Sequence, residues 1–183
     1  NDFWRYDPLG NTFTRLTDSN RSHYHHTATL DRQNGRLVVP GPFNIDSYSL
    51  ISESWSFSFT ALPLTGMHSA ADGLNESGKT VIFLFGGLDN YGNKSDKVYE
   101  LDINTLALTQ RPDSMPHPVA NGASARLLID QGAGGVTGRS NGGSELVKVL
   151  LFGGMTGDVP TNDTLLFRLE KAKSVSLPWL QLL

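Results

Sequence analysis

The sequence predicts an all-β fold of short strands, and three observations lead to that prediction. Two apolar runs, at residues 81–87 and 147–154, each end in Phe-Gly-Gly. Short β-branched runs that are closed by glycine are typical of buried strands. A polar loop and then an alternating apolar segment follow each run. Finally, no segment sustains the periodicity of an amphipathic helix.

The composition supports one packed domain and excludes several classes of function. The chain has 183 residues, of which 38% are hydrophobic, and this content favours a core over a disordered chain. Its net charge of −3 gives no reason to expect binding to nucleic acid. No apolar run reaches the roughly 18–20 residues of a membrane helix. Cysteine is absent, which excludes disulfides, thiolate nucleophiles and Cys-ligated zinc in these residues.

Alternating segments predict five strands in the first 60 residues. The dipeptide Asn34-Gly35 is a strong hairpin signal and predicts a tight turn. In the strand that follows this turn, Pro40-Gly41-Pro42 takes the place of a closing glycine pair. We expect these strands, in order, at residues 2–8, 11–16, 26–31, 36–42 and 53–59.

The two Phe-Gly-Gly runs organise the rest of the chain. The pairs Gly86-Gly87 and Gly153-Gly154 are expected to end their strands and to let the backbone turn or pack closely. Residues 132–144 are rich in glycine, serine and asparagine, which predicts a flexible insertion. Besides the two runs, we expect strands at residues 68–72, 96–102, 123–130 and 163–170.

Aromatic residues recur along the predicted strands at an interval near 50 residues. The aromatic anchors, spaced by 51, 44 and 68 residues, are Trp4, Trp55, Tyr99 and Phe167. The predicted insertion accounts for the long last interval. A period of roughly 50 residues is that of kelch repeats, in which four strands form one blade of a β-propeller.

The chain therefore resembles the kelch-repeat β-propeller family over nearly its whole length. The resemblance implies four-stranded antiparallel blades: the last two strands of one blade at residues 1–19, then blades at 20–66, 67–115 and 116–183. It places the family's tryptophan at Phe13, Leu64, Leu108 and near residues 176–177. Because propellers have four to eight blades, we expect an incomplete ring, closed by further chain rather than by a second copy.

The same resemblance implies a non-catalytic module that binds a protein partner and uses no cofactor or metal. The loops after each glycine-closed strand would lie on one face and form the binding surface. These loops are residues 43–53, 88–95 and 155–162. The preferred patch within them is Asp89, Asn90, Tyr91, Asn93 and Lys94. The alternative for each of these residues is a solvated turn without a binding role.

The main alternative function is half of a secreted propeller whose active site lies outside these residues. Such a propeller would be similar to galactose oxidase or to carbohydrate-binding propellers. Because cysteine is absent, the Tyr–Cys cofactor of such copper oxidases does not form within this sequence. No Gly-x-Ser-x-Gly nucleophile elbow is present either, so the sequence does not indicate a hydrolase of that type.

Two groups of residues are candidate metal ligands. His23 and His25 would share one face of a strand and would hold a divalent metal if a carboxylate or a third histidine joined them. We favour the alternative, in which this segment is the entrance to a blade and His26 packs or forms hydrogen bonds. Asp113 and His117 form a second pair, four residues apart, but the glutamate that kelch-type specifier proteins place four residues earlier to bind iron is Thr109 here, so this match fails.

Four N-glycosylation sequons fall in predicted loops, and they begin at Asn20, Asn75, Asn93 and Asn162. A surface loop of a secreted protein tolerates a bulky glycan. The sequons favour an extracellular or membrane-anchored glycoprotein, although no membrane span is expected within these residues.

Overall fold

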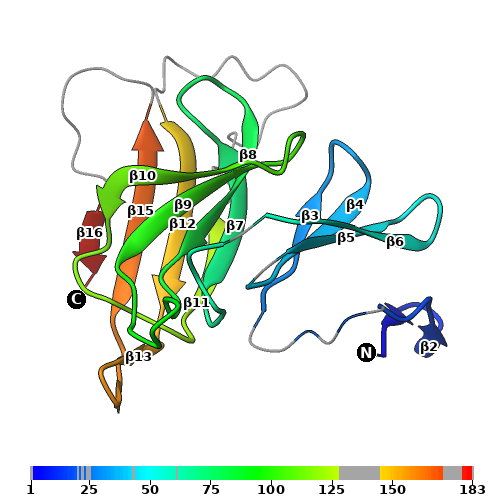
Figure 1. Cartoon of the computed structure of the whole chain (residues 1–183), viewed down its shortest axis with the longest axis horizontal. Helices are drawn as coiled ribbons and strands as arrows, with labels where there is room; N and C mark the ends of the chain where they lie inside the picture. Colours follow the sequence, from blue (N-terminus) through cyan, green and yellow to red (C-terminus); the bar gives the residue numbers. More distant parts are fainter. Residues whose placement is uncertain are drawn as a thin grey trace.

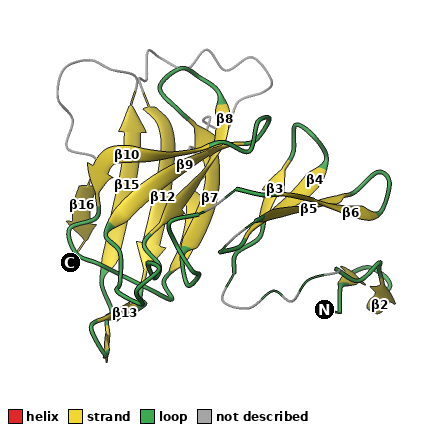
Figure 2. Cartoon of the chain, in the orientation of Figure 1, coloured by secondary structure: helices red, strands yellow, loops and turns green. Residues whose placement is uncertain are grey.

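The computed structural model describes residues 2–19, 21, 23, 26–42, 44–60, 62–127, 145–170 and 179–182. It confirms the all-β class, because every paired strand in this part of the chain is antiparallel and no helix occurs there (Figure 2). Accordingly, none of these residues belongs to a helix long and apolar enough to cross a membrane. The predicted insertion at 132–144 lies outside the described residues.

Three four-stranded antiparallel sheets follow one another along the chain (Figure 1). Sheet I contains β3 (Thr29–Asp31), β4 (Arg36–Pro40), β5 (Ile45–Ser49) and β6 (Ser54–Ser58). Sheet II contains β7 (Ser69–Leu74), β8 (Thr80–Phe85), β9 (Lys97–Asp102) and β10 (Leu108–Ser114). Sheet III contains β11 (Ala123–Leu127), β12 (Glu145–Phe152), β15 (Thr164–Glu170) and β16 (Trp179–Leu182).

Two short hairpins complete the described structure. The N-terminal hairpin precedes sheet I and consists of β1 (Trp4–Asp7) and β2 (Thr12–Arg15). The second hairpin consists of β13 (Met155–Thr156) and β14 (Val159–Pro160), and it lies within the predicted loop 155–162. In Figure 1 the N-terminal hairpin and sheet I lie at the right, and sheets II and III overlap at the left.

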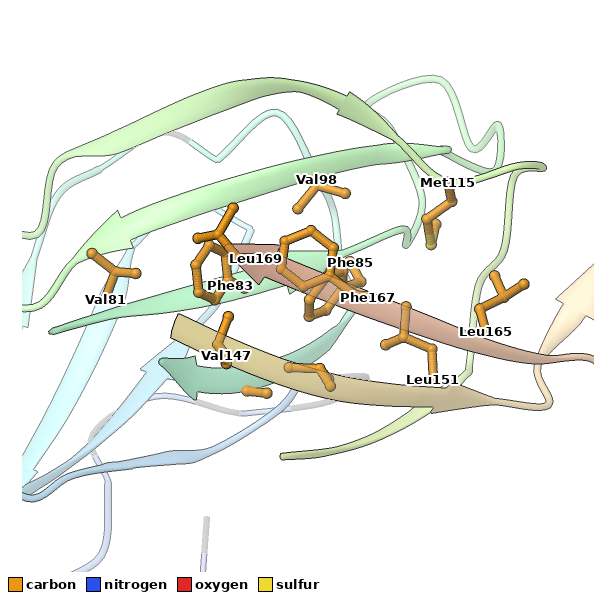
Figure 3. Close-up of a cluster of buried hydrophobic side chains, with 12 residues drawn as sticks. Val81, Phe83, Phe85, Val98, Met115, Val147, Leu151, Leu165, Phe167 and Leu169 are labelled. Carbon is orange, nitrogen blue, oxygen red and sulfur yellow. The ribbon is translucent and has the colours of Figure 1, made fainter. Parts of the chain in front are cut away.

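The sheets pack face to face through two apolar cores. Sheet II contributes alternate residues of β8 to each core, since successive side chains of a strand point to opposite faces. Phe83 and Phe85 pack toward Phe167 of sheet III in the first core (Figure 3). Ile82 and Leu84 pack in the second core with residues of sheet I and of the segment after it, namely Val38, Ile45, Leu62 and Leu64.

The first strands of successive sheets lie side by side. Strand β7 contacts β3 on one side and β11 and β12 on the other. Across the β7–β11 boundary, Ser124 Oγ donates a hydrogen bond of 2.8 Å to the carbonyl of Ala70, and Arg126 forms an ion pair with Asp72. The three sheets therefore pack in the order in which they occur in the sequence. The first strand of each sheet lies nearest to the adjacent sheets.

The turn between third and fourth strands has the same design in sheets I and II and in the N-terminal hairpin. In each, a polar side chain that ends the third strand accepts backbone hydrogen bonds from the turn; these residues are Asp7, Ser49 and Asp102. Four positions later the backbone has a positive φ, of 48°, 49° and 57° at Asn11, Glu53 and Leu106. The N-terminal hairpin is therefore the third and fourth strand of a sheet of the same kind.

Strand register shows which residues are equivalent, and it corrects two expectations. At one equivalent position of the third strand, the N-terminal hairpin and sheets I, II and III have, in that order, Tyr6, Tyr48, Leu101 and Phe167. The fourth-strand residues that pair with them are, in the same order, Phe13, Trp55, Leu108 and Trp179. The anchor Trp55 is thus a fourth-strand residue, whereas Trp4 and Tyr99 lie two residues before the third-strand position. The resemblance placed Leu64 and residues near 176–177 in one class with Phe13 and Leu108, whereas by register the equivalents of Phe13 and Leu108 are Trp55 and Trp179.

The predicted binding loop at residues 43–53 is wrong, because β5 lies inside it. Gly41 N–H donates a hydrogen bond of 2.8 Å to the carbonyl of Asn44, so the chain reverses over a few residues and not over a long loop. Ile45 and Tyr48 are then buried on opposite faces of β5. Asp46, Ser47 and Ser49 interrupt the apolar residues of this segment, so a prediction based on apolar runs misses the strand.

Candidate functional site

Two of the three predicted binding loops lie together at one end of sheets II and III. Residues 88–95 and 155–162, which we call the loop face, follow the glycine pairs that end β8 and β12. Lys94 Nζ donates a hydrogen bond to the carbonyl of Gly157 and so joins the two loops. In Figure 1 they lie at the lower end of the sheets, near β13.

The loop that carries the preferred patch is ordered by its own aspartate. Asp89 accepts hydrogen bonds of 2.8 Å from the backbone N–H groups of Tyr91 and Asn93, and one of 3.1 Å from Asn93 Nδ2. The side-chain bond from Asn93 is the main cause that lowers the pKa of Asp89 below its ordinary value. Asp89 and Asn93 therefore hold the shape of the loop.

The same arrangement leaves apolar groups projecting from the loop face. Tyr91 is 90% exposed at the tip of its loop, and Asn90 beside it is exposed. Val159, on the β13–β14 hairpin, is 67% exposed. Aromatic residues such as tyrosine are enriched where proteins bind one another.

A backbone network beneath the loop face connects it to both sheets. Gly87 N–H donates to the carbonyl of Val119 at 2.8 Å, and Leu88 N–H donates to that of Gly66 at 2.9 Å. Ala120 and Met155 exchange backbone hydrogen bonds of 3.2 and 2.8 Å. Because these bonds cross between sequence-distant segments, the loops rest on a fixed platform.

One contact at this end of the sheets was not predicted. His117 Nε2 lies 2.9 Å from Asp163 Oδ2, between the segment after β10 and the one before β15. The spacing in the sequence instead suggests Asp113 as the neighbour of His117. The structure gives Asp113 a different partner, since it binds Arg111 at 2.8 Å. No spacing in the sequence signals this contact, since its members lie in segments that flank different sheets.

The candidate metal ligands near the N-terminus are described only in part. His23 Nε2 lies 3.2 Å from Asp46 Oδ2 and 2.9 Å from Ser19 Oγ, and the His23 and His26 rings are 5.2 Å apart. His25 lies outside the described residues. Within the part of the chain that the structure describes, no group of three metal-binding side chains is placed to hold an ion.

The contacts of His23 also differ from those of a hydrolase triad. In such a triad the acid binds one imidazole nitrogen and the serine binds the other. Here Ser19 and Asp46 both approach Nε2, so the arrangement provides no path from the serine through the ring to the acid. These residues position the segment before β3 against sheet I.

The sequons differ in how free their asparagine side chains are. Asn75 Nδ2 donates to Glu100 at 2.7 Å, and its Oδ1 accepts two bonds from Ser77 and one from Lys79. Asn93 is engaged with Asp89, as described above. Asn162 is exposed, and Asn20 lies outside the described residues. A glycan on Asn75 or Asn93 would replace a side-chain hydrogen bond of the structure.

A buried histidine at the start of β7 predicts a dependence of stability on pH. His68 is 3% exposed, and neither ring nitrogen has a hydrogen-bond partner among the residues that the structure describes. Burial, together with the nearby His26, lowers its pKa from 6.5 to about 4. The unfolded chain therefore takes up a proton at a higher pH than the folded one, and stability falls as the pH drops below 6.5.

We expect the wild type to lose about 2 kcal/mol more than His68→Leu between pH 7 and pH 5. Urea unfolding of both proteins at pH 7, 6 and 5 measures this difference. The substitution removes the titrating group, while all other acidic and basic groups are common to both chains. Parallel changes in unfolding free energy would contradict the buried, neutral state of His68.

Comparison with known proteins supports the fold. No family model matches the chain, and no curated protein matches it. Among solved structures, that of YjhT matches with 17% sequence identity and a TM-score of 0.55. The match covers 91% of this chain and 72% of YjhT. At this identity the likeness concerns the arrangement of the strands alone.

Proposed function

We propose that the chain is a sector of a kelch-type β-propeller and acts as a non-catalytic module that binds a protein through the loop face. The observation that carries this proposal is the hydrogen bond from Lys94 to Gly157, which unites two predicted binding loops into one surface. Tyr91 and Val159 give that surface exposed apolar groups. The Phe-Gly-Gly repeats and the face-to-face packing of four-stranded sheets support the propeller assignment.

Photo-crosslinking from the loop face tests the binding role. A photoreactive p-benzoylphenylalanine in place of Tyr91 should give one discrete crosslinked species in an extract of cells that naturally make the protein. The same residue in place of Ile51 is the matched control, because Ile51 is 86% exposed at the opposite end of the strands, in the β5–β6 turn. Equal products from both positions, or none from position 91, would contradict the proposal.

The variant Lys94→Ala tests whether the two loops act together. Loss of the bond to Gly157 should lower the yield of the crosslink from position 91 and leave folding unchanged, since substitutions at exposed loops usually alter stability by less than about 0.5 kcal/mol. Crosslink yield and thermal denaturation are measured on the same preparations. An unchanged yield would show that Tyr91 binds without help from the second loop.

A further inference from the structure

A small cavity lies between sheets II and III, at the roots of the two loops that form the loop face. Its volume is about 20 Å³, which is enough for one water-sized group. On the side of sheet III it is lined by Gly153 and Asp163, which lie just before and just after residues 155–162. On the side of sheet II it is lined by Phe85 and by His117 of the segment after β10. The cavity therefore belongs to the contact between two neighbouring sheets.

Most of the cavity wall is apolar. Met115, Leu151 and Leu165 line it and belong to the first core, at the right in Figure 3. Phe152 also lines the cavity and is 44% exposed, so the apolar surface continues from the cavity to the outside. A wall of this kind suits a hydrocarbon chain that enters from the loop face.

The polar groups of the cavity lack partners within the chain. Both ring nitrogens of His117 are shielded from solvent, and within the described residues neither forms a hydrogen bond. Nε2 lies 2.9 Å from Asp163 Oδ2 without the alignment of a hydrogen bond. Among the described residues that line the cavity, none is a lysine or an arginine. A shielded polar group without a partner is unfavourable, so a ligand that donates hydrogen bonds here would be stabilised.

We propose that this cavity receives the ammonium group of a lysine side chain of the protein partner, an inference that rests on the proposed binding role of the loop face. The ammonium would donate hydrogen bonds to the carboxylate of Asp163 and to a ring nitrogen of His117. The methylene groups of the lysine would lie against Phe152 and the apolar wall, because a lysine side chain buries its stem and directs its charge to polar groups.

The size of the cavity and the charges around it favour lysine as the occupant. An ammonium group is a compact charge, whereas the guanidinium of arginine is planar and carries three nitrogen atoms, which needs more than a water-sized space. The loop face itself has two acidic residues, Asp89 and Asp158, and one basic residue, Lys94. Lys94 is bound to the carbonyl of Gly157, so the charge that remains is acidic and complements a basic partner.

Small amines test the cavity without any protein partner. The chain has three methionines, so methyl groups labelled with ¹³C give a simple spectrum. Met115 lines the cavity and reports binding, whereas Met67 is not among the lining residues and is the reference. The probes are n-butylammonium, which has the stem and charge of lysine, n-propylguanidinium, which has those of arginine, and 1-butanol, which has no charge.

We expect n-butylammonium to shift the Met115 resonance in a saturable manner. Its affinity should exceed that of each other probe at least about tenfold, since a hydrogen bond to a charged group is stronger than one to a neutral group. A shift of Met115 by 1-butanol or n-propylguanidinium at the same or a lower concentration would overturn the proposal. A Met115 resonance that responds to none of the probes would overturn it as well.

The variant Asp163→Asn tests the carboxylate. It should weaken the binding of n-butylammonium at least about tenfold and leave the binding of 1-butanol unchanged. Asp96→Asn is the matched control, because Asp96 directly follows the first loop, is 35% exposed against 33% for Asp163, and forms an ion pair with Lys97. Equal affinity of the two variants for n-butylammonium would overturn the proposal. The comparison of the three probes on the wild type provides a test that does not depend on the folding of either variant.

The crosslink from position 91 distinguishes this inference from the proposed function. Asp163→Asn should lower the yield of that crosslink severalfold, whereas Asp96→Asn should leave it unchanged. A crosslink of equal yield in both variants would overturn the lysine contact and leave the binding role of the loop face intact. Tight binding of n-butylammonium without any crosslink would instead contradict the proposed function and, with it, the partner protein as the source of the amine.

Discussion

Gly86→Ala should destabilise the chain by about 4 kcal/mol, whereas Gly153→Ala should cost only about 1 kcal/mol. Both glycines are the first of their pair, and their φ angles are nearly the same, at 63° and 64°. A Cβ atom on Gly86 would lie 2.2 Å from the carbonyl oxygen of Val119. The nearest atom to a Cβ on Gly153 is the carbonyl oxygen of Thr161 at 3.7 Å, which is an ordinary contact.

The matched pair separates backbone strain from crowding. An alanine at positive φ costs about 1 kcal/mol at either position. Crowding against the segment that leads into sheet III adds to this cost only at Gly86. The crowded atom of Val119 is its backbone carbonyl oxygen, which cannot move aside without disturbing the hydrogen bonds beneath the loop face. Urea unfolding of the two variants measures the difference. Losses that agree within about 0.5 kcal/mol would show that the glycine pair serves the turn alone.

Arg111→Met should destabilise the chain by about 3 kcal/mol at neutral pH, because it removes a buried cation from three carboxylates, two of which are largely shielded from solvent. The Arg111 side chain is 8% exposed and binds Glu76, Glu100 and Asp113, at distances between 2.5 and 3.1 Å. Burial lowers the pKa of Arg111, but hydrogen bonds from it to Glu76 and Asp113 outweigh this and raise the pKa above its ordinary value. This loss of stability lies at the lower end of the range for breaking a buried ion pair, since the Glu76 side chain is half exposed.

The pH dependence of this loss is a second test of the same network. The hydrogen bond from Arg111 is the main cause that lowers the pKa of Glu76, so this interaction stabilises the fold above the ordinary value of 4.5 and is lost as the pH falls below it. The gap between wild type and variant should therefore narrow below pH 4.5. Arg15→Met, which removes an exposed pair with Asp2 and Asp18, is the control and should have no measurable effect. A gap that stays constant down to pH 3 would contradict the account.

A strand was predictable from the sequence where one short segment contains all the residues that identify it. The Phe-Gly-Gly runs located β8 and β12, and the conformations of their glycines follow from the lack of a Cβ atom. Strand β5 was missed for the opposite reason. Its first four residues are all buried, yet two of them are Asp46 and Ser47, and Pro40-Gly41-Pro42 shortens the turn before it. A local pattern cannot show that the turn is short until the pairing of Pro40 with Ile45 is known.

The candidate site was predictable only in part. The loops after the glycine pairs were located, and Tyr91 and Lys94 lie on the surface where they meet. Asp89 and Asn93, predicted as binding residues, are engaged in holding their own loop. The contact of His117 with Asp163 and the carboxylates around Arg111 join residues from separate strands or sheets. Such contacts depend on packing between sheets, which composition and spacing do not encode.

The most direct test of the account concerns the packing of sheet II on sheet III, since that packing brings the two loops together. The Phe167 ring lies 5.3 Å from that of Phe83 and 5.2 Å from that of Phe85, measured between centroids. A nuclear Overhauser spectrum of the chain with labelled phenylalanine rings, assigned with Phe83→Leu and Phe85→Leu, measures these contacts. We expect cross-peaks from Phe167 to both rings. Cross-peaks from Phe167 to residues of sheet III alone would contradict the face-to-face packing and, with it, the loop face.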